Sequence, residues 1–589
     1  MLSDLEEMMK SIVICGILLS IVSLTSSAEA TPLVEPTPSK LSTSLLNLGS
    51  RACVRCHAAV SEQWSRSSHR HASLSNPYYA AAARVHFEKR GGEGEGSILF
   101  CARCHDPALI NRSNDGPDQV PIFKVTNTLS AARDPARAGV GCLLCHSMKR
   151  TPDPRGNGKY HLDLDPLVLR GDDHRQRFTS PLSRSSKLCA TCHKVSLSEE
   201  ITQHQWLRGQ DDADQWSQSA WAGVDPLRPL AEPKPHTPCQ GCHMPLTKTA
   251  LSDRAADDQG RVRSHAFLGA NASVAAWVGA EQHVRQTARF VHDSVTLWLR
   301  ESSALSSVNF REYPEGADRD VTLDLIALNV GAGHRIPAGV NDTNEMWLEV
   351  LAWDKQGHLI SHSGLLPELS PPPPYLITNS PPDSPPITRS ARPPSAHIFR
   401  AQAVDDQGDP LARRDVTAQR SVVFDTSLHP FEPRLIRLSL PAHAHLVSAR
   451  VLMRQFERPY LTFACASLSP DQSPDDHEAH TRCTSQPTLE VASIMWSRDH
   501  VVDQMYDEHR LPSWPDALVH LIALSRGEPE YVREADELWS SLPETLRLSA
   551  RGLIARLSID VALGRTDQVI HTSRSLWSPL QHPFYGSSA

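Results

Sequence analysis

Five copies of one short pattern carry the chemistry that this sequence can perform. Each copy reads Cys-x-x-Cys-His, and the five are Cys53-Cys56-His57, Cys101-Cys104-His105, Cys142-Cys145-His146, Cys189-Cys192-His193 and Cys239-Cys242-His243. Two thiols at this spacing can add to the two vinyl groups of one haem, and the histidine that follows is then held beneath the iron. The sequence therefore predicts five c-type haems, with the five motif histidines as proximal iron ligands.

Zinc sites and disulfide frameworks also use paired cysteines. A structural zinc ion needs four ligands, usually from two Cys-x-x-Cys pairs, and five pairs do not divide into twos. Neither alternative requires a histidine directly after every pair. With this content of cysteine and histidine, chance predicts about 0.014 copies of the pattern, so haem attachment is the interpretation that explains all five.

The sixth coordination position of each iron also needs a ligand. Methionine is scarce after the first thirty residues, whereas the chain has 29 histidines. We therefore expect mostly bis-histidine ligation, which gives lower redox potentials than histidine–methionine ligation. Glycines on both sides of His334 predict a close approach of the backbone to a macrocycle. The candidate distal ligands are His69, His174, His265, His334 and His86.

Three of the 13 cysteines lie outside the motifs. Cys15 lies in an N-terminal apolar run. Cys465 and Cys483 flank an acidic stretch, Leu468 to Thr481, and an oxidising compartment favours a disulfide over two free thiols. We therefore predict a Cys465–Cys483 bridge.

The first thirty residues have the layout of a secretory signal peptide. Lys10 precedes an apolar run from Ile12 to Leu24, and Ala28 and Ala30 form a small-residue cleavage site. A membrane anchor is the alternative, but the run is short for a bilayer span. We expect an exported protein, periplasmic or extracellular, with no membrane span in the mature chain.

The spacing of apolar residues changes along the chain and predicts a multidomain protein. The haem-binding part should have sparse, mainly helical structure, with short helices beside the motifs and a longer helix over 272–300. Alternating segments predict a small β-sandwich; they are Val321–Leu325, Trp347–Val350, Leu435–Leu440 and Arg450–Met453. The C-terminal part has helical spacing, either as a tetratricopeptide-like docking segment or as a helical cap on the sandwich.

These patterns give the expected boundaries. They are 1–30 (signal peptide), 31–47 (linker), 48–317 (pentahaem domain with the following helix), 318–460 (β-sandwich with a proline-rich insertion at 367–394), 461–512 (linker with the disulfide) and 513–589 (tetratricopeptide-like helical segment).

Several segments resemble multihaem cytochromes related to hydroxylamine oxidoreductase and the nitrifier tetrahaem cytochrome. They are Trp64–His69, Phe100–His105, Gly139–Cys142, Leu188–His193 and Pro238–Pro245. The later motifs His265-x-Phe267-x-Gly269 and Gly333-His334-x-x-Pro337-x-Gly339 resemble a subgroup of that family, in which they are thought to supply distal ligands. The resemblance spans residues 48–460 and implies a compact haem domain whose macrocycles stack in close pairs as a conductive chain.

The chain departs from the enzymes of that group. A pentahaem nitrite reductase typically has lysine in place of one motif histidine, but all five motifs here end in histidine. Hydroxylamine oxidation needs more haems and a tyrosine crosslink, and nothing marks Tyr78, Tyr79 or Tyr160 as crosslinked. The resemblance therefore leaves activity open.

Two classes of function follow. The first is an electron-transfer cytochrome whose partner is a redox protein, such as another cytochrome or a membrane quinol-linked complex, and which has no catalytic residue. The alternative is an oxidoreductase acting on a nitrogen or sulfur oxyanion, or a hydroxylamine-like substrate, at a five-coordinate haem. A structural or sensory haem protein would need only one haem. The formal net charge of −8, without a basic cluster, speaks against nucleic-acid binding.

Overall fold

The computed structural model describes most of the chain between residues 53 and 580. The described residues are 53–90, 99–107, 139–151, 153, 155–162, 172–223, 236–301, 320–340, 342–364, 396–411, 413–468, 474–498, 532–533, 536–537, 539–540, 544–548 and 550–580. The expected signal peptide, the linker at 31–47 and the proline-rich insertion lie outside them and stay predictions.

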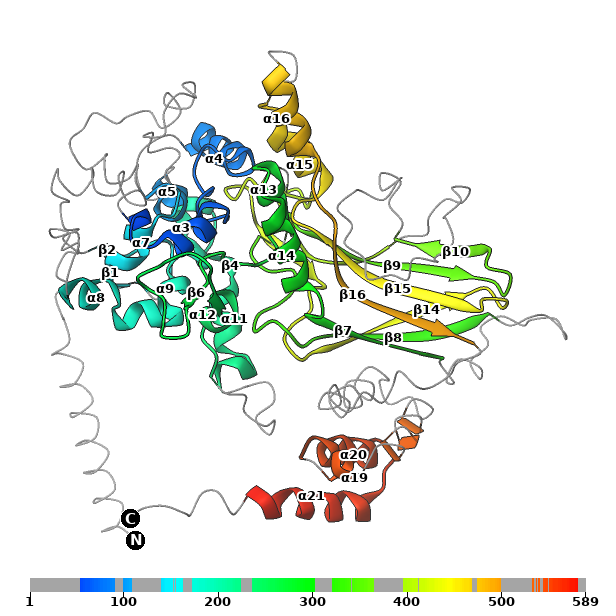
Figure 1. The fold of residues 1–589 in the computed structure, drawn as a ribbon. Coiled ribbons are helices and arrows are strands. Elements are labelled where there is room, and N and C mark those ends of the chain that lie inside the picture. Colours follow the sequence, from blue (N-terminus) through cyan, green and yellow to red (C-terminus); the bar gives the residue numbers. More distant parts are fainter. Residues whose placement is uncertain are drawn as a thin grey trace, which may run out of the picture. The chain divides into compact units, whose positions relative to one another are not determined.

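Short helices contain, overlap or directly follow the Cys-x-x-Cys-His motifs, and Figure 1 shows these helices close together. The amide of His57 donates to the carbonyl of Cys53 at 2.9 Å, and the amide of His193 donates to Cys189 at 2.9 Å. One helical turn therefore brings both thiols and the imidazole of a motif to one side of the backbone. The helices at the motifs are α3 (Ala58–Ser65), α5 (Leu99–His105), α7 (Cys142–Ser147), α9 (Ser186–Ala190) and α12 (Cys239–His243).

Small antiparallel ribbons follow the third, fourth and fifth motifs. They are β1 (Met148–Arg150) with β2 (His161–Leu162), β3 (Lys194–Leu197) with β4 (Leu207–Asp211), and β5 (Leu246–Lys248) with β6 (Arg261–Arg263). The other helical elements of this region are α4 (Pro77–Arg90), α8 (Asp172–Phe178), η3 (Pro181–Arg184), α10 (Glu199–Thr202), α11 (Asp212–Ser217), η4 (Ala220–Ala222), α13 (Ala272–Trp277) and α14 (Glu281–Val291). The described part of this region is thus built from short helices and small sheets.

Two antiparallel sheets follow the haem-binding region. One has the order β14-β8-β7, and the other has the order β10-β9-β15-β16, with β11 also paired to β9. A separate hairpin joins β12 and β13. The strands are β7 (Val295–Glu301), β8 (Val321–Asn329), β9 (Glu345–Trp353), β10 (Leu359–Ser363), β11 (His397–Phe399), β12 (Ala401–Val404), β13 (Ser421–Asp425), β14 (Pro433–Leu440), β15 (Leu446–Arg454) and β16 (Leu489–Ser497). Strands β8, β9, β14 and β15 contain the four alternating segments of the sequence.

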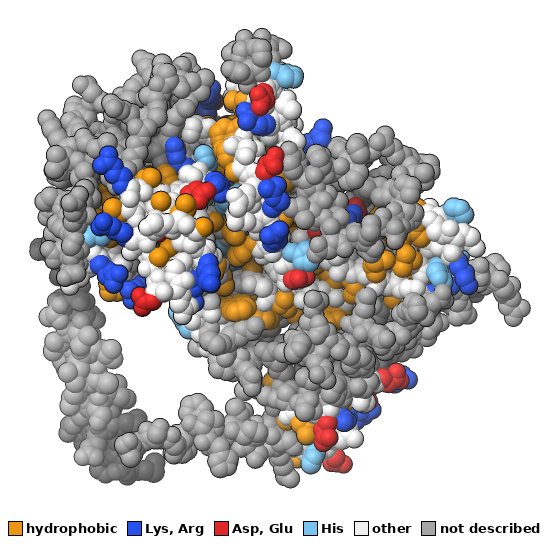
Figure 2. Space-filling model, in the orientation of Figure 1, with side chains coloured by type: hydrophobic (Ala, Val, Ile, Leu, Met, Phe, Trp, Pro, Cys, Tyr) orange, Lys and Arg blue, Asp and Glu red, His pale blue; other side chains and the backbone are white. Residues whose placement is uncertain are grey.

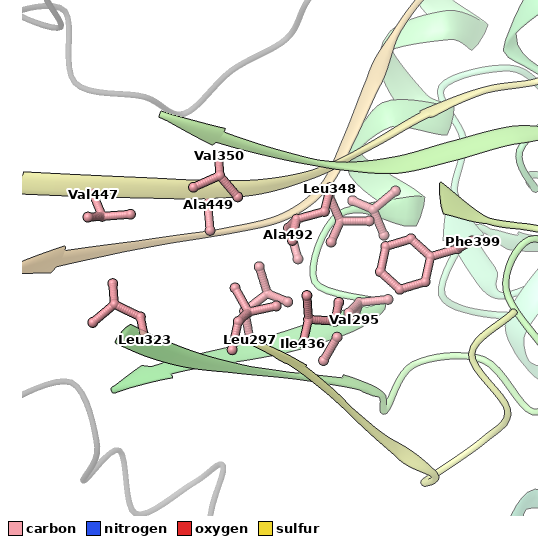
Figure 3. Close-up of a cluster of buried hydrophobic side chains, with 14 of the residues drawn as sticks. Val295, Leu297, Leu323, Leu348, Val350, Phe399, Ile436, Val447, Ala449 and Ala492 are labelled. Carbon is pink, nitrogen blue, oxygen red and sulfur yellow. The ribbon is translucent and has the colours of Figure 1, made fainter. Parts of the chain in front are cut away.

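A hydrophobic core fills the space between the two sheets. Alternate residues of the strands point inward, as the period of two requires: Leu323 of β8 and Leu297 of β7 point into the space between the sheets from one side, and Val350 and Leu348 of β9 point into it from the other (Figure 3). Phe399 of β11 is fully buried at the same core. This packing gives the sandwich a rigid body from which its loops project.

The longer helix expected over 272–300 is wrong. The segment forms α13 and α14, separated at Gly279, whose φ of +71° ends the first helix. A second left-handed residue, Asp293 (φ +61°), ends the helical part, and β7 then pairs with β8. Val295 and Leu297 alternate toward the core, so this part of the segment forms a strand although the residues before it have helical spacing.

The sheets also extend beyond the 318–460 range expected from the sequence. Strand β7 lies before it, and β16 lies after it and pairs with β15 along its length. The segment expected as a linker over 461–512 contains α16 (Pro474–Thr484) and β16, and α15 (Arg458–Cys465) extends into it. Burial of Val491 and Trp496 explains why this segment is held in the fold.

A disulfide joins Cys465 of α15 to Cys483 of α16. Both cysteines are fully buried and pack with Tyr78 and Tyr460. The Tyr78 hydroxyl donates to the carbonyl of Cys483 at 2.9 Å, and the Tyr460 hydroxyl donates to the carbonyl of Tyr78 at 2.6 Å. The disulfide therefore braces the part of the fold that contacts α4.

Replacing Cys465 and Cys483 together by serine should lower the free energy of unfolding by about 3 kcal/mol, because the closed loop restricts the unfolded chain. Denaturant titration followed by far-UV circular dichroism would measure the change, with the haem absorbance recorded in parallel. Cys465→Ser alone should have a similar effect, since either change opens the loop. An unchanged midpoint in both variants would contradict the expectation.

Three C-terminal helices are described by themselves: α19 (Glu544–Arg547), α20 (Ala550–Ala562) and α21 (Thr566–Leu580). Gly564, with φ +69°, lies in the turn between α20 and α21. Arg556 of α20 binds the carboxylates of Asp560 and Asp536. The tetratricopeptide-like character of this segment stays a prediction.

The described surface carries both charged and hydrophobic side chains. On the face drawn in Figure 2, basic and acidic side chains are interspersed among the described residues and do not gather into one patch. Every helix in the described part of the chain is too short or too polar to span a bilayer.

Candidate haem-binding site

A single cavity of about 2690 Å³ is lined by residues from all five Cys-x-x-Cys-His motifs. A pocket for one drug-sized ligand has roughly 300–1,000 Å³, so this cavity has room for several large groups. All five candidate distal histidines also line it. The size and lining of the cavity fit a set of haems attached to the motif cysteines.

The Nδ1 atom of every motif histidine has a partner in the protein. Four donate a hydrogen bond through Nδ1: His57 to Asp253 Oδ1 (3.0 Å), His105 to Ala72 O (3.0 Å), His146 to Phe178 O (2.7 Å) and His243 to Leu268 O (2.6 Å). The fifth, His193, has Nδ1 at 3.6 Å from Asp212 Oδ2. A protonated Nδ1 leaves the lone pair on Nε2, which is the arrangement a metal-binding imidazole needs.

Four motif histidines face a second imidazole across a gap of the same width. The ring centroids are 6.1 Å apart for His57 and His174, 6.1 Å for His193 and His69, 6.3 Å for His146 and His265, and 6.2 Å for His243 and His334. Two imidazole nitrogens, each about 2 Å from one metal, put the ring centroids about 6 Å apart. The gaps therefore fit one iron each, and four of the predicted distal candidates lie where such a ligand belongs.

The remaining motif histidine, His105, has a different neighbour. Its ring stacks on Tyr79 with 4.1 Å between centroids and 9° between planes, which is van der Waals contact and leaves no space for a metal between the rings. His86, the fifth distal candidate, lies buried on α4 with its ring 6.2 Å from that of Phe100. Within the described residues, the structure pairs His105 with no second imidazole.

Burial keeps most of these imidazoles neutral. Burial lowers the pKa of His69 to about 3, with the charge of His193 as a smaller cause. It also lowers the pKa of His265 and of His243 to about 4. A neutral imidazole is the form that binds a metal, so these positions are prepared for ligation.

His193 is the exception among the buried ligands. Burial alone would lower its pKa, but the nearby carboxylate of Asp212 raises the pKa above the ordinary value. Burial would likewise raise the pKa of Asp212, yet His193 and the charge of His334 hold the pKa of Asp212 well below its usual range. Asp212 is therefore an ionised carboxylate inside the cavity wall.

Thiols of different motifs are neighbours, which shows how the motifs are arranged. The thiols that lie next to each other are Cys53 and Cys142, Cys192 and Cys104, and Cys189 and Cys239. Burial raises the pKa of Cys145 to about 12, and the nearby Cys192 adds to the shift. The fourth motif therefore lies between the second, third and fifth motifs, while the first motif adjoins the third.

The segment from His265 to Leu268 contacts three motif sites. His265 faces His146, the Phe267 ring lies edge-on to His69 at 4.4 Å, and the carbonyl of Leu268 accepts from His243. Phe267 has a left-handed φ of +49°, an unusual conformation for an aromatic residue. This turn directs the His265 ring, the Phe267 ring and the Leu268 carbonyl toward three different sites. It therefore gives a physical reason for the His265-x-Phe267-x-Gly269 pattern.

The loop that carries His334 projects from β8 of the sandwich and is fixed to α11. The amide of Gly339 donates to Asp212 Oδ1 at 2.8 Å, and the amide of Arg335 donates to Gln215 Oε1 at 3.0 Å. A Cβ at Gly333 would lie 2.9 Å from Trp216. Gly333 therefore permits a close approach to this tryptophan, and the expected approach of the backbone to a macrocycle stays a prediction.

Sequence reasoning missed three side chains of the site. Asp253 and Asp212 contact motif histidines, and Tyr79 stacks on His105. Asp253 lies 196 residues from His57 in an ordinary polar loop, so no local pattern marks it. Asp212 and Tyr79 likewise lie outside any motif.

Comparison with known proteins bears on the cofactor. Residues 52–147 match the family described as cytochrome c554 and c-prime. The matched range contains the first three motifs, and the match supports a multihaem c-type cytochrome that transfers electrons. No curated protein matches the sequence.

One solved structure is also similar. A penta-haem cytochrome c552 from Thermochromatium tepidum has 16% sequence identity to this chain and a TM-score of 0.45. The alignment covers 77% of this chain and 99% of that chain.

Proposed function

We propose that the protein is a pentahaem cytochrome that carries electrons between redox partners. The observation that carries this proposal is the set of four imidazole pairs, all with ring centroids 6.1–6.3 Å apart, around one cavity lined by five haem-attachment motifs. Unrelated buried histidines would not repeat one metal-sized gap four times. Iron held by two fixed imidazoles keeps its ligands when it changes charge, which suits electron transfer.

Each motif would hold one haem through its two cysteines and its histidine. The ligand pairs would be His57 with His174, His146 with His265, His193 with His69, and His243 with His334, while His105 would hold the second haem from one side. When bound, the haems supply one-electron redox chemistry. The protein's part is to fix the imidazoles, exclude water from between them and keep neighbouring motifs in contact.

We infer an order for the electron path from the neighbouring thiols of the motifs. The first motif adjoins the third, the third adjoins the fourth, and the fourth adjoins the second and the fifth. The fourth haem would then be the branch point, and the first, second and fifth would be the ends. A redox protein, such as another cytochrome or a membrane quinol-linked complex, would exchange electrons at one of these ends in a periplasmic or extracellular compartment.

The purified, haem-loaded protein should contain five haems, of which four are low-spin. Mass spectrometry and the pyridine haemochrome spectrum would count the haems, and low-temperature EPR of the oxidised protein would separate the spin states. Four low-spin signals and one high-spin signal match the four imidazole pairs and the unpaired His105. A protein with fewer than five haems, or with several high-spin signals, would contradict the proposed ligand set.

A second candidate function rests on the second motif. Because His105 stacks on Tyr79 and faces no second imidazole within the described residues, the iron of its haem would keep an open position. Arg414 lines the cavity near Cys101 and forms an ion pair with Asp342, so its guanidinium is fixed in this region. An iron with an open position suits an oxidoreductase acting on a nitrogen or sulfur oxyanion.

The same EPR sample can distinguish the two functions. Addition of nitrite or sulfite should convert the high-spin signal to low-spin if the anion binds the open iron. Consumption of the anion by the reduced protein would then support an oxidoreductase. If the high-spin signal is unaltered by both anions, electron transfer remains the function that the structure supports.

A further inference from the structure

One motif histidine is held by a carboxylate from a distant part of the chain. His57 Nδ1 donates to Asp253 Oδ1 at 3.0 Å, and the Asp253 side chain has no exposed surface. The corresponding acceptors of His105, His146 and His243 are backbone carbonyls, and the carboxylate nearest His193 is farther away, at 3.6 Å. The first motif thus has the closest anionic partner of the five.

The same carboxylate also fixes the start of helix α3. Asp253 Oδ2 accepts from the amides of Ala59 and Val60 at 3.1 and 3.2 Å, and Oδ1 accepts from Ala255 at 2.8 Å. The amides of Ala59 and Val60 belong to the first turn of α3, where backbone N–H groups have no partner within the helix. His57 immediately precedes this turn, so one side chain sets both the helix start and the imidazole.

The loop that carries Asp253 is itself anchored to the motif. It connects β5 to β6, and the amide of Arg254 donates to the carbonyl of Cys56 at 2.9 Å. Three backbone N–H donors and one imidazole surround the carboxylate, an environment that stabilises its negative charge. The imidazole of His57 therefore faces a fixed anion and not a neutral carbonyl.

An anionic acceptor strengthens an imidazole as a metal ligand. It draws the Nδ1 proton toward itself, so that more electron density remains on Nε2 and the oxidised, more positive metal is favoured. Ligand basicity and outer hydrogen bonding are among the means by which a protein sets haem potentials. The backbone carbonyls at His105, His146 and His243 do this less strongly because they carry no net charge, and Asp212 does it less strongly at His193 because it lies farther away.

We propose that Asp253 is a positioning residue for His57 whose carboxylate lowers the redox potential of the haem at the first motif. This inference rests on the proposed function, since it takes His57 as an iron ligand. It goes beyond that function by naming a residue outside every haem motif that makes one end of the electron path more reducing.

The test uses the full-length, haem-loaded protein with Asp253→Asn, which keeps the shape of the side chain and removes its charge. Potentiometric titration followed by EPR should show that one low-spin haem has a higher midpoint potential and altered g-values, while the other three are unchanged. A variant with Cys53→Ser and Cys56→Ser, which lacks the first haem, identifies that signal. Asp257→Asn is the matched control, because Asp257 accepts from Gln259 and Arg261 in the same loop without touching a histidine.

A purely structural role for Asp253 predicts different results. Asp253→Asn would then leave every retained haem at its original potential, and that outcome would overturn the proposal. If the Asp253→Asn protein lacks the first haem, the Asp253→Glu protein, which keeps the charge, should contain that haem at its original low potential. Loss of the first haem in both variants would also overturn it. Failure of the proposed function is separate, because it would appear as missing haems or missing low-spin signals in the unaltered protein.

Discussion

Replacing His334 by alanine should convert one low-spin haem to a high-spin haem and leave the other low-spin haems as they were. The ring centroids of His334 and His243 are 6.2 Å apart, and the angle between the ring planes is 10°. Without His334, the iron held by His243 would lose its sixth ligand. EPR of the oxidised protein should lose one of four low-spin signals, and the midpoint potential of that haem should rise because the remaining ligand set donates less charge.

Two further variants make the His334 experiment decisive. His334→Met should keep that iron six-coordinate and raise its potential, as histidine–methionine ligation does. His358→Ala is the control, because His358 is an exposed histidine of the same sandwich that binds Asp354 and lies away from the cavity. Unchanged spectra and potentials in both His334 variants would remove this residue from the ligand set. Circular dichroism should confirm that the sandwich stays folded in all three.

The His334 result would also test why the sandwich is present. The His334 loop crosses from β8 to α11 through the contacts of Gly339 with Asp212 and of Arg335 with Gln215. Asp212 in turn lies 3.6 Å from His193. The sandwich would therefore supply a ligand for the haem at the fifth motif, and it fixes Asp212 beside His193 of the fourth, so we infer that the haem domain is completed by the domain that follows it.

Local chemistry could be predicted from the sequence, whereas tertiary pairing could not. The motif spacing alone places two thiols and an imidazole on one helical turn, and the structure has this arrangement. The partner of each motif histidine depends on how distant segments meet. His69 follows the first motif by 12 residues, yet it faces His193 of the fourth motif.

The errors in the predicted fold have a similar origin. Residues 295–301 follow a helical segment, and the helical spacing was extended into them although Val295, Leu297 and Leu299 alternate as in a strand. Their pairing with β8 decides the matter, because it buries Val295 and Leu297 in the core between the sheets. Asp253 was missed because its role arises from contact with residues about 195 positions away, which leaves no trace in local spacing.

Replacing Cys189 and Cys192 by serine should remove one haem and separate the others into groups that exchange electrons slowly. The thiols of the fourth motif lie next to thiols of the second and fifth motifs, and Cys192 also lies near Cys145 of the third. Its loss would leave the first and third haems together, with the second and the fifth each isolated. Mass spectrometry should report four haems in place of five.

The matched control removes a haem at an end of the path. Cys53→Ser with Cys56→Ser also lowers the haem count from five to four, but it leaves the contacts among the other four motifs in place. After photochemical injection of less than one electron per molecule, the electron should redistribute in this control as in the unaltered protein. In the Cys189 and Cys192 variant the redistribution should slow by at least about tenfold, which corresponds to a barrier higher by about 1.4 kcal/mol. Equal redistribution in the two variants would mean that the fourth haem is not the branch point, because the thiol contacts would then not describe the path that electrons take.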